Sequence, residues 1–157
     1  MNDKTPSSPE YCLILFSSEL EFTLMSIVQI NKLIIDAANE KIFLMIITSS
    51  NIYNITRENT KINYEKLTLI INDFLSSNNL KITEIKEIYI NRGPGSFAGI
   101  RNSLSVVKAF SVAKKIDYYC YSLKDFKGEG DVSYENIPDL CNKFKIKKNL
   151  INPIYIS

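Results

Sequence analysis

The chain has 157 residues and a mass of 18.0 kDa, a length typical of one domain. Its net charge of +2 is too small for nucleic-acid binding through bulk electrostatics alone. No histidine is present, which excludes an imidazole base, a histidine-containing triad and histidine metal ligands. The three cysteines (Cys12, Cys120 and Cys141) lie far apart and form no CxxC pair, so neither a disulfide framework nor a zinc site is expected. A reducing, cytoplasmic location is the simplest expectation.

Residues 1–30 are predicted to be an N-terminal extension of uncertain structure. The first ten residues are polar and include two prolines, and residues 11–30 are largely apolar without a clear period. No stretch approaches the roughly 18 apolar residues of a membrane span, so no membrane association is expected. The acidic, proline-containing start does not resemble a secretory signal. Met25 is an alternative start of the protein.

From residue 31 the pattern becomes regular. Three runs rich in β-branched residues are separated by short polar turns and predict an antiparallel meander. Apolar residues at i, i+3, i+4, i+7 and i+8, from Leu67 to Leu75, predict a helix. The expected strands are Lys32–Asp36, Lys41–Thr48, Asn51–Arg57, Ile85–Ile90 and Asp117–Ser122, and the second helix is Ala98–Lys115.

The predicted order is therefore β-β-β-α-β-α-β. Three antiparallel strands followed by two helix–strand units are the connectivity of a ribonuclease-H-like or actin-like half, an α/β fold with a mixed sheet and helices on its faces. Residues 31–123 form this lobe. Residues 124–157 are too few for a second lobe of similar size, so they are expected to be a short C-terminal appendage.

The segment between the fourth strand and the second helix, Asn91–Arg101, needs unusual backbone chemistry. Its sequence, NRGPGSFAGIR, contains three of the five glycines of the chain. Glycine permits a positive φ or a close approach of another backbone. Ser96 is placed to cap the following helix, whose N–H groups are a potential anion site. A tight strand-to-helix turn and a phosphate-binding loop both fit this spacing, but no GK[ST] follows, so it is not a P-loop.

The amino-acid sequence of this segment resembles the GPGSFTGLR-type signature of the TsaB (YeaZ) family. These proteins help to make N6-threonylcarbamoyladenosine at position 37 of tRNA. The stretches IIDAANEKIFLMII and NYEKLTLIINDFL are similar to the opening hairpin and the first helix of the family, and NPIYIS resembles its closing Pro-x-Tyr segment. The signature loop residues are Gly93, Pro94, Gly95, Ser96, Phe97, Gly99 and Arg101.

The resemblance implies a non-catalytic subunit that pairs with a TsaD-type transferase and works beside a TsaE-type ATPase. It further implies that the chain binds no cofactor itself, that the wider pathway uses ATP and Mg, and that contact with tRNA is only indirect. A homodimer is an alternative assembly. The chain departs from the family after Asp36, where Ala37 and Ala38 replace a Thr-Ser pair, at Tyr64, where His is frequent, and in its reduced second lobe. Asp36 is therefore interpreted as a turn residue or as the vestige of a nucleotide site.

Other functions were weighed against this one. An independent nucleotide-binding or hydrolytic enzyme of the actin-like superfamily is the main alternative. A two-metal nuclease needs further carboxylates, but Asn91-Arg92 stand where the fourth strand would supply one. The absence of histidine argues against a metallopeptidase. The apolar arc of the second helix fits either a deep core position or a partner interface, and the interface residues nominated on the two helices are Leu69, Val106 and Phe110.

Overall fold

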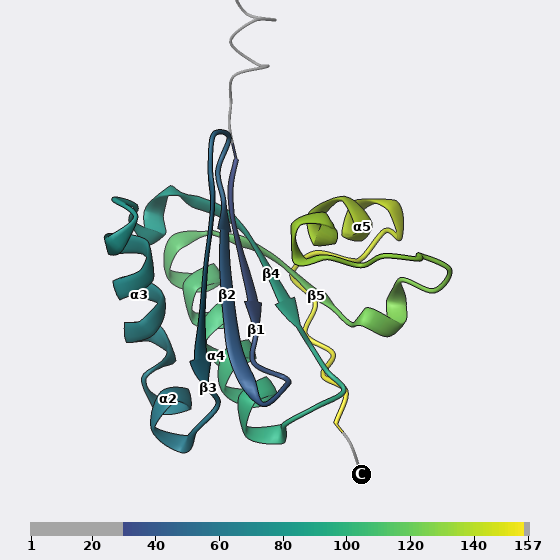
Figure 1. Cartoon of the computed structure of the whole chain (residues 1–157), viewed down its shortest axis with the longest axis horizontal. Helices are drawn as coiled ribbons and strands as arrows, with labels where there is room; N and C mark the ends of the chain where they lie inside the picture. The colour runs from purple at the N-terminus through teal and green to yellow at the C-terminus, as the bar shows by residue number, and fades with distance from the viewer. Residues whose placement is uncertain (1–29, 156–157) are drawn as a thin grey trace, which may run out of the picture.

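The computed structural model describes residues 30–155, so the extension before Ile30 and the alternative start at Met25 lie outside the described residues. A five-stranded mixed sheet forms the centre, with strand order β3-β2-β1-β4-β5 (Figure 1). The first three strands are antiparallel neighbours, whereas β4 runs parallel to both β1 and β5. This confirms the predicted α/β fold and order. The strands are β1 (Asn31–Asp36), β2 (Lys41–Ile47), β3 (Ile52–Glu58), β4 (Ile85–Asn91) and β5 (Asp117–Tyr121).

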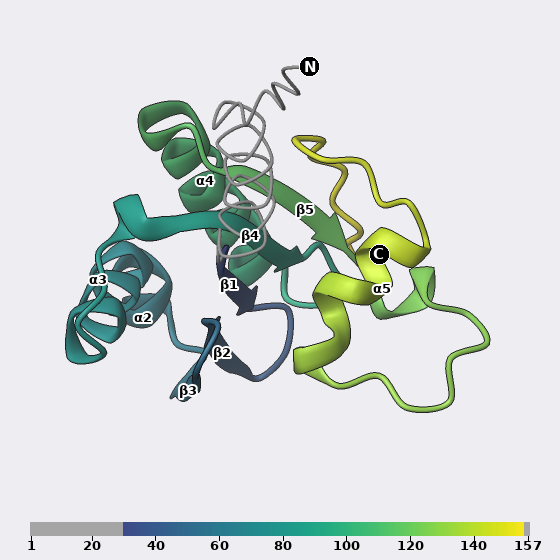
Figure 2. The same ribbon diagram turned by 90° about the horizontal axis from the view of Figure 1, so that it is seen from above.

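Helices cover both faces of this sheet (Figures 1 and 2). On one side lie α2, α3 and α4, and on the other lies α5. The two predicted helices are confirmed as α3 and α4, while the five-residue α2 was not predicted from periodicity. The helices are α2 (Lys61–Glu65), α3 (Leu67–Ser77), α4 (Phe97–Lys114) and α5 (Ile137–Lys143), with short 3-10 turns η1 (Ile82–Glu84), η2 (Leu123–Asp125) and η3 (Tyr134–Asn136).

The alternation of side chains along the central strands builds two separate apolar layers. In β1, Leu33 and Ile35 face α3 and α4 and are fully buried there. The neighbouring Ile34 points to the opposite face and packs under the C-terminal segment. Because the central strand is buried on both sides, it reads as a continuous apolar run and not as an alternating one.

The C-terminal appendage supplies the cover of the second face. Phe126, Ile137 and Leu140 are buried against Met45 and Tyr121 of the sheet. Phe126 also stacks on Tyr121 with ring centroids 5.9 Å apart. The segment after β5 therefore completes the same domain, because it covers a sheet face that would otherwise be exposed to water.

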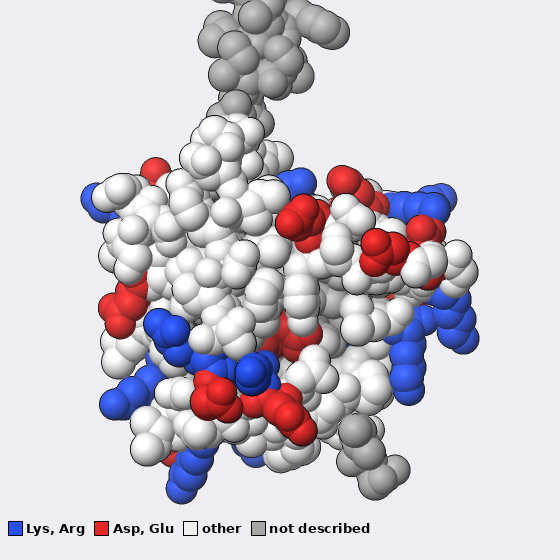
Figure 3. All heavy atoms as spheres, in the orientation of Figure 1, with Lys and Arg blue, Asp and Glu red and all other residues white. Residues whose placement is uncertain are grey.

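The face seen in Figure 1 has no field of a single sign. Acidic and basic side chains are intermixed around its edges and across its lower part, and the middle of the face is largely uncharged (Figure 3). Among the described residues, no helix is long and apolar enough to span a bilayer.

Candidate functional site

The glycine loop connects the end of β4 to the start of α4 and is held by side chains at both ends. Asn91 accepts a hydrogen bond from the backbone N–H of Gly93 through Oδ1, at 2.9 Å. Ser96 caps α4, as predicted, with Oγ 3.3 Å from the N of Gly99. Gly93 has a φ of +102°, which only glycine adopts easily. A Cβ there would also lie 2.2 Å from the carbonyl oxygen of Ile154.

The other two loop glycines serve close packing and have no positive φ. A Cβ on Gly95 would lie 2.0 Å from the carbonyl oxygen of Ala38, and a Cβ on Gly99 would lie 2.0 Å from that of Ala37. The Ser96 N–H donates to the Ala38 oxygen at 2.7 Å. The loop is therefore fastened directly onto the β1–β2 turn, and this docking uses backbone polar groups that a phosphate site would need to keep free.

Asp36 ends β1 beside this loop and is 1% exposed. Its Oδ1 accepts from the Ala38 N–H at 3.0 Å, which is the turn-forming bond expected of aspartate. Its Oδ2 accepts from Asn91 Nδ2 at 3.0 Å and from the Tyr134 hydroxyl at 2.8 Å. Both oxygens are thus occupied by the protein itself. Asp36 was interpreted as a turn residue or as the vestige of a nucleotide site, and its hydrogen bond to the Ala38 N–H shows that it acts as a turn residue.

Tyr134 brings the appendage into this network. Its ring stacks on Phe43 of β2 with centroids 4.0 Å apart. Burial, together with the neighbouring Asp36 carboxylate, raises the pKa of Tyr134 above its usual value. The hydroxyl therefore keeps its proton and stays a donor to Asp36. Sequence reasoning missed this residue, because a tyrosine 98 positions from Asp36 in a segment without clear periodicity gives no local signal.

The remaining reactive groups are also unsuited to chemistry. Burial raises the pKa of both Cys120 and Cys141 to about 12, so their thiols stay protonated and unreactive near neutral pH. Cys12 lies outside the described residues. Within residues 30–155 no three acidic, cysteine or histidine side chains gather in a way that could hold a metal ion.

An open groove of about 780 Å³ lies where the loop meets the β1–β2 turn and α2. Tyr64 of α2 reaches across to Ser96, with the two hydroxyl oxygens 2.9 Å apart. Glu40 is the only carboxylate that lines the groove, so no pair of carboxylates is available there for general acid and base catalysis. The groove lining is Ala38, Asn39, Glu40, Lys41, Asn59, Tyr64, Pro94, Gly95 and Ser96.

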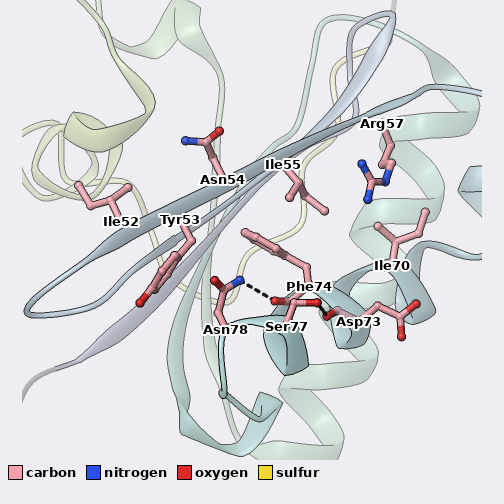
Figure 4. A pocket seen from close by; sticks show the side chains of 10 residues that line it. All are labelled: Ile52, Tyr53, Asn54, Ile55, Arg57, Ile70, Asp73, Phe74, Ser77 and Asn78. Carbon is pink, nitrogen blue, oxygen red and sulfur yellow. Dashed lines mark hydrogen bonds between the residues drawn. The ribbon is translucent and has the colours of Figure 1, made fainter.

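A second groove, of about 530 Å³, runs between the edge strand β3 and helix α3 (Figure 4). Its floor is apolar and includes Ile55 and Phe74, and its charged groups are Arg57 on the strand and Asp73 on the helix. Figure 4 shows Asn78 turned back onto its own helix, where it donates to the Phe74 carbonyl at 2.8 Å. A single opposite charge pair on an apolar floor gives no catalytic arrangement.

Arg92 links the loop to the end of the chain. Its guanidinium forms an ion pair with Asp125 of η2 at 2.8 Å and donates to the Asn152 carbonyl at 3.0 Å. The Ile154 N–H donates to the Arg92 carbonyl at 2.8 Å. Tyr155 bridges to Gly95 and packs its ring at 4.7 Å from that of Phe97. The closing segment, residues 150–155, is thus part of the loop's immediate surroundings.

The three nominated interface residues occupy different environments. Leu69 on α3 is 59% exposed. Val106 and Phe110 are only partly exposed and pack against the main core cluster, because α3 lies beside α4 and fills much of its apolar arc. On the outer side of the same helices, Val112 of α4 is 72% exposed and Ile62 of α2 is 62% exposed. Sequence reasoning missed these two.

Part of the sequence is similar to a known protein family. Residues 57–122 match the family model described as TsaD, tRNA N6-adenosine threonylcarbamoyltransferase. This match runs from the last two residues of β3 to the residue after β5, which is less than half of the chain, and it includes the entire glycine loop. Over this stretch the chain is similar to the TsaD family. This similarity supports the resemblance read from the glycine loop.

Solved structures show the same fold at low sequence identity. YeaZ from Pseudomonas aeruginosa matches with a TM-score of 0.55 and 19% identity, over 59% of this chain and 44% of that chain. A second structure, described as an uncharacterized protein with similarity to peptidase YEAZ from Pseudomonas aeruginosa, gives 0.56 and 19%, over 59% and 43%. The chain therefore matches less than half of the length of either relative. No curated protein matches it at a significant level.

Proposed function

We propose that this chain is a TsaB/YeaZ-like protein, a non-catalytic, cytoplasmic subunit of the tRNA threonylcarbamoyladenosine machinery, and that it pairs with a TsaD-type transferase and supports its active conformation. A TsaE-type ATPase would work in the same assembly. The observation that supports the proposal most is that both carboxylate oxygens of Asp36 accept hydrogen bonds from the protein itself. The carboxylate stands at the sheet edge where ligands of α/β folds bind, and its oxygens are taken up by Ala38, Asn91 and Tyr134.

The outer side of the helical layer supports a role through pairing. Large apolar side chains are more than half exposed on all three of its helices: Ile62 on α2, Leu69 on α3, and Phe97 and Val112 on α4. Large apolar side chains that remain exposed on one layer of a protein are candidates for a protein contact. A standard interface buries about 800 Å² on each partner, which two or three adjacent helices can supply.

Charge substitutions on this layer test the proposal. Leu69→Glu and Val112→Glu place a charge on exposed positions, so we expect each variant to keep its melting temperature and to lose capture of a purified TsaD-type subunit. Leu123→Glu is the matched control, since Leu123 is 52% exposed on the 3-10 turn η2, away from these helices. That control should bind the TsaD-type subunit as the unmodified chain does.

Val106→Glu tests whether Val106 belongs to the core of the domain or to a partner surface. Because Val106 packs against the main cluster, a carboxylate there should lower the free energy of unfolding by about 2 kcal/mol or more. The reconstituted tRNA modification reaction should require the chain. Two results would contradict the proposal: capture of the TsaD-type subunit unchanged by both Leu69→Glu and Val112→Glu, or micromolar ATP binding with turnover by the isolated chain, which would favour the independent actin-like enzyme.

A further inference from the structure

A groove along one side of α4 is formed by two stretches of the chain that contain no acidic residue. Residues 88–116 contain no Asp or Glu, and neither do residues 140–157. The first stretch includes all of α4, and the second includes the closing segment, residues 150–155. Helix α4 and the closing segment line this groove, which has a volume of about 360 Å³. The small net charge of the whole protein therefore conceals a local excess of positive charge.

The cations of this groove lie in one row. Arg101 and Lys108 line it seven residues apart, an interval that returns to nearly the same side of a helix. At 1.5 Å per residue, the two residues are about 10 Å apart along the axis. None of the three ion pairs among residues 30–155 involves either side chain. Lys108 lies over the ring of Tyr118, with Nζ 5.7 Å from the ring centroid, a contact that leaves its charge without a carboxylate partner. Both cations can therefore contact an anionic ligand with several charges.

The other lining groups are apolar and aromatic. Ile151, Pro153 and Tyr155 come from the closing segment, and Leu104 comes from α4. Tyr155 is 41% exposed and stands beside Phe97, which is 56% exposed. A row of cations next to exposed aromatic rings is the combination that binds single-stranded nucleic acid, since the cations contact phosphates and the rings stack on bases.

The spacing also suits a nucleic-acid strand. Phosphates follow one another at about 3.4 Å along the axis of a stacked strand, so two cations about 10 Å apart would meet phosphates three positions apart. An acidic peptide would use the cations but gives no reason for a pair of exposed aromatic rings at the end of the row. The observations therefore favour a polynucleotide.

We propose that the groove between α4 and residues 150–155 binds a single-stranded stretch of RNA, with Arg101 and Lys108 on phosphates and Tyr155 stacked on a base. This goes beyond the expectation that contact with tRNA is only indirect. This inference rests on the proposed function in one respect only, which is that the bound RNA is a tRNA. Binding itself is a property of the isolated chain and can be measured without any partner.

The test is fluorescence anisotropy of labelled tRNA with the purified chain at about 50 mM salt, where phosphate contacts contribute most. We expect Arg101→Glu/Lys108→Glu to weaken binding about tenfold or more. Lys127→Glu/Lys147→Glu is the matched control, because it changes the net charge equally at exposed positions outside the groove. The control should weaken binding less than threefold. Tyr155→Ala should weaken binding about fivefold or more, with circular dichroism unchanged.

The salt dependence gives a second readout. Loss of two phosphate contacts should reduce the slope of log K against log salt by about 1.4 for a single strand. Equal weakening by the two charge-reversed pairs would overturn the proposal, since only bulk charge would then act. Equal binding to phosphatidylserine vesicles and to tRNA would also overturn it.

The two proposals fail separately when capture is tested with Leu69→Glu on α3, because Val112 stands four residues after Lys108 on the same side of α4 as the groove. A chain that binds tRNA through Arg101 and Lys108 but captures no TsaD-type subunit would refute the proposed function and leave the groove assignment standing. A chain that captures the subunit but binds tRNA equally well with and without these two cations would refute the groove assignment alone.

Discussion

Gly95→Ala should destabilise the domain although it adds only one methyl group. The new Cβ would lie 2.0 Å from the Ala38 carbonyl oxygen and 2.9 Å from the Ala38 Cβ, so either the loop or the β1–β2 turn must move. Inserting one methyl group into a packed site costs about 1–3 kcal/mol. Loss of the Ser96–Ala38 hydrogen bond would add about 1 kcal/mol, giving a total of about 2–4 kcal/mol.

Urea unfolding followed by circular dichroism measures this loss, and a thermal scan should show a melting temperature lower by about 4–16 °C. Gly130→Ala is the matched control, since nothing lies within 4 Å of an added Cβ there and the φ is not positive. That variant should be neutral or more stable by up to about 1 kcal/mol, because alanine reduces the entropy of the unfolded chain. If Gly95→Ala unfolds within about 0.5 kcal/mol of the unmodified protein, the close docking of the loop is wrong.

Two further predictions concern a buried hydroxyl and two buried thiols. Tyr134→Phe removes the hydroxyl that donates to Asp36, so the free energy of unfolding should fall by about 1.5–3 kcal/mol in urea titrations, and no change would show that the bond contributes nothing. Cys120 and Cys141 should resist a thiol reagent at pH 8 in the native state and react fully in denaturant, because burial raises both pKa values to about 12; rapid native labelling of either would contradict that burial.

The sheet and the two long helices could be predicted because their apolar periods are uninterrupted. The five-residue α2 could not, since it has no buried residue and is positioned by its Thr60 cap. Helix α5 was also missed, although Ile137, Leu140, Cys141 and Phe144 stand at i, i+3, i+4 and i+7, because the run covers only two turns and contains Pro138. Nothing in that short run indicates which face of the sheet it covers.

The candidate site could be predicted in its location but not in its internal contacts. The three glycines indicated positive φ or close packing, and the structure assigns positive φ to Gly93 and close packing to Gly95 and Gly99. That division depends on the Ala37–Ala38 turn, which is distant in the sequence. Likewise, the apolar arc of α4 could not distinguish a neighbouring helix of the same chain from a partner, and Val106 and Phe110 were nominated for that reason.

The contacts between the glycine loop and the closing segment have a consequence for synthesis of the protein. Gly93 packs against Ile154, and Arg92 depends on Asn152, so the loop cannot reach its final arrangement until residue 154 has left the ribosome. The sheet strands are complete by Tyr121. Contacts between residues so far apart in the chain slow folding, because the intervening chain must be ordered first. A nascent chain paused after β5 would therefore display a formed sheet with an unfinished loop and an uncovered second face, the state in which it is most exposed to chaperones.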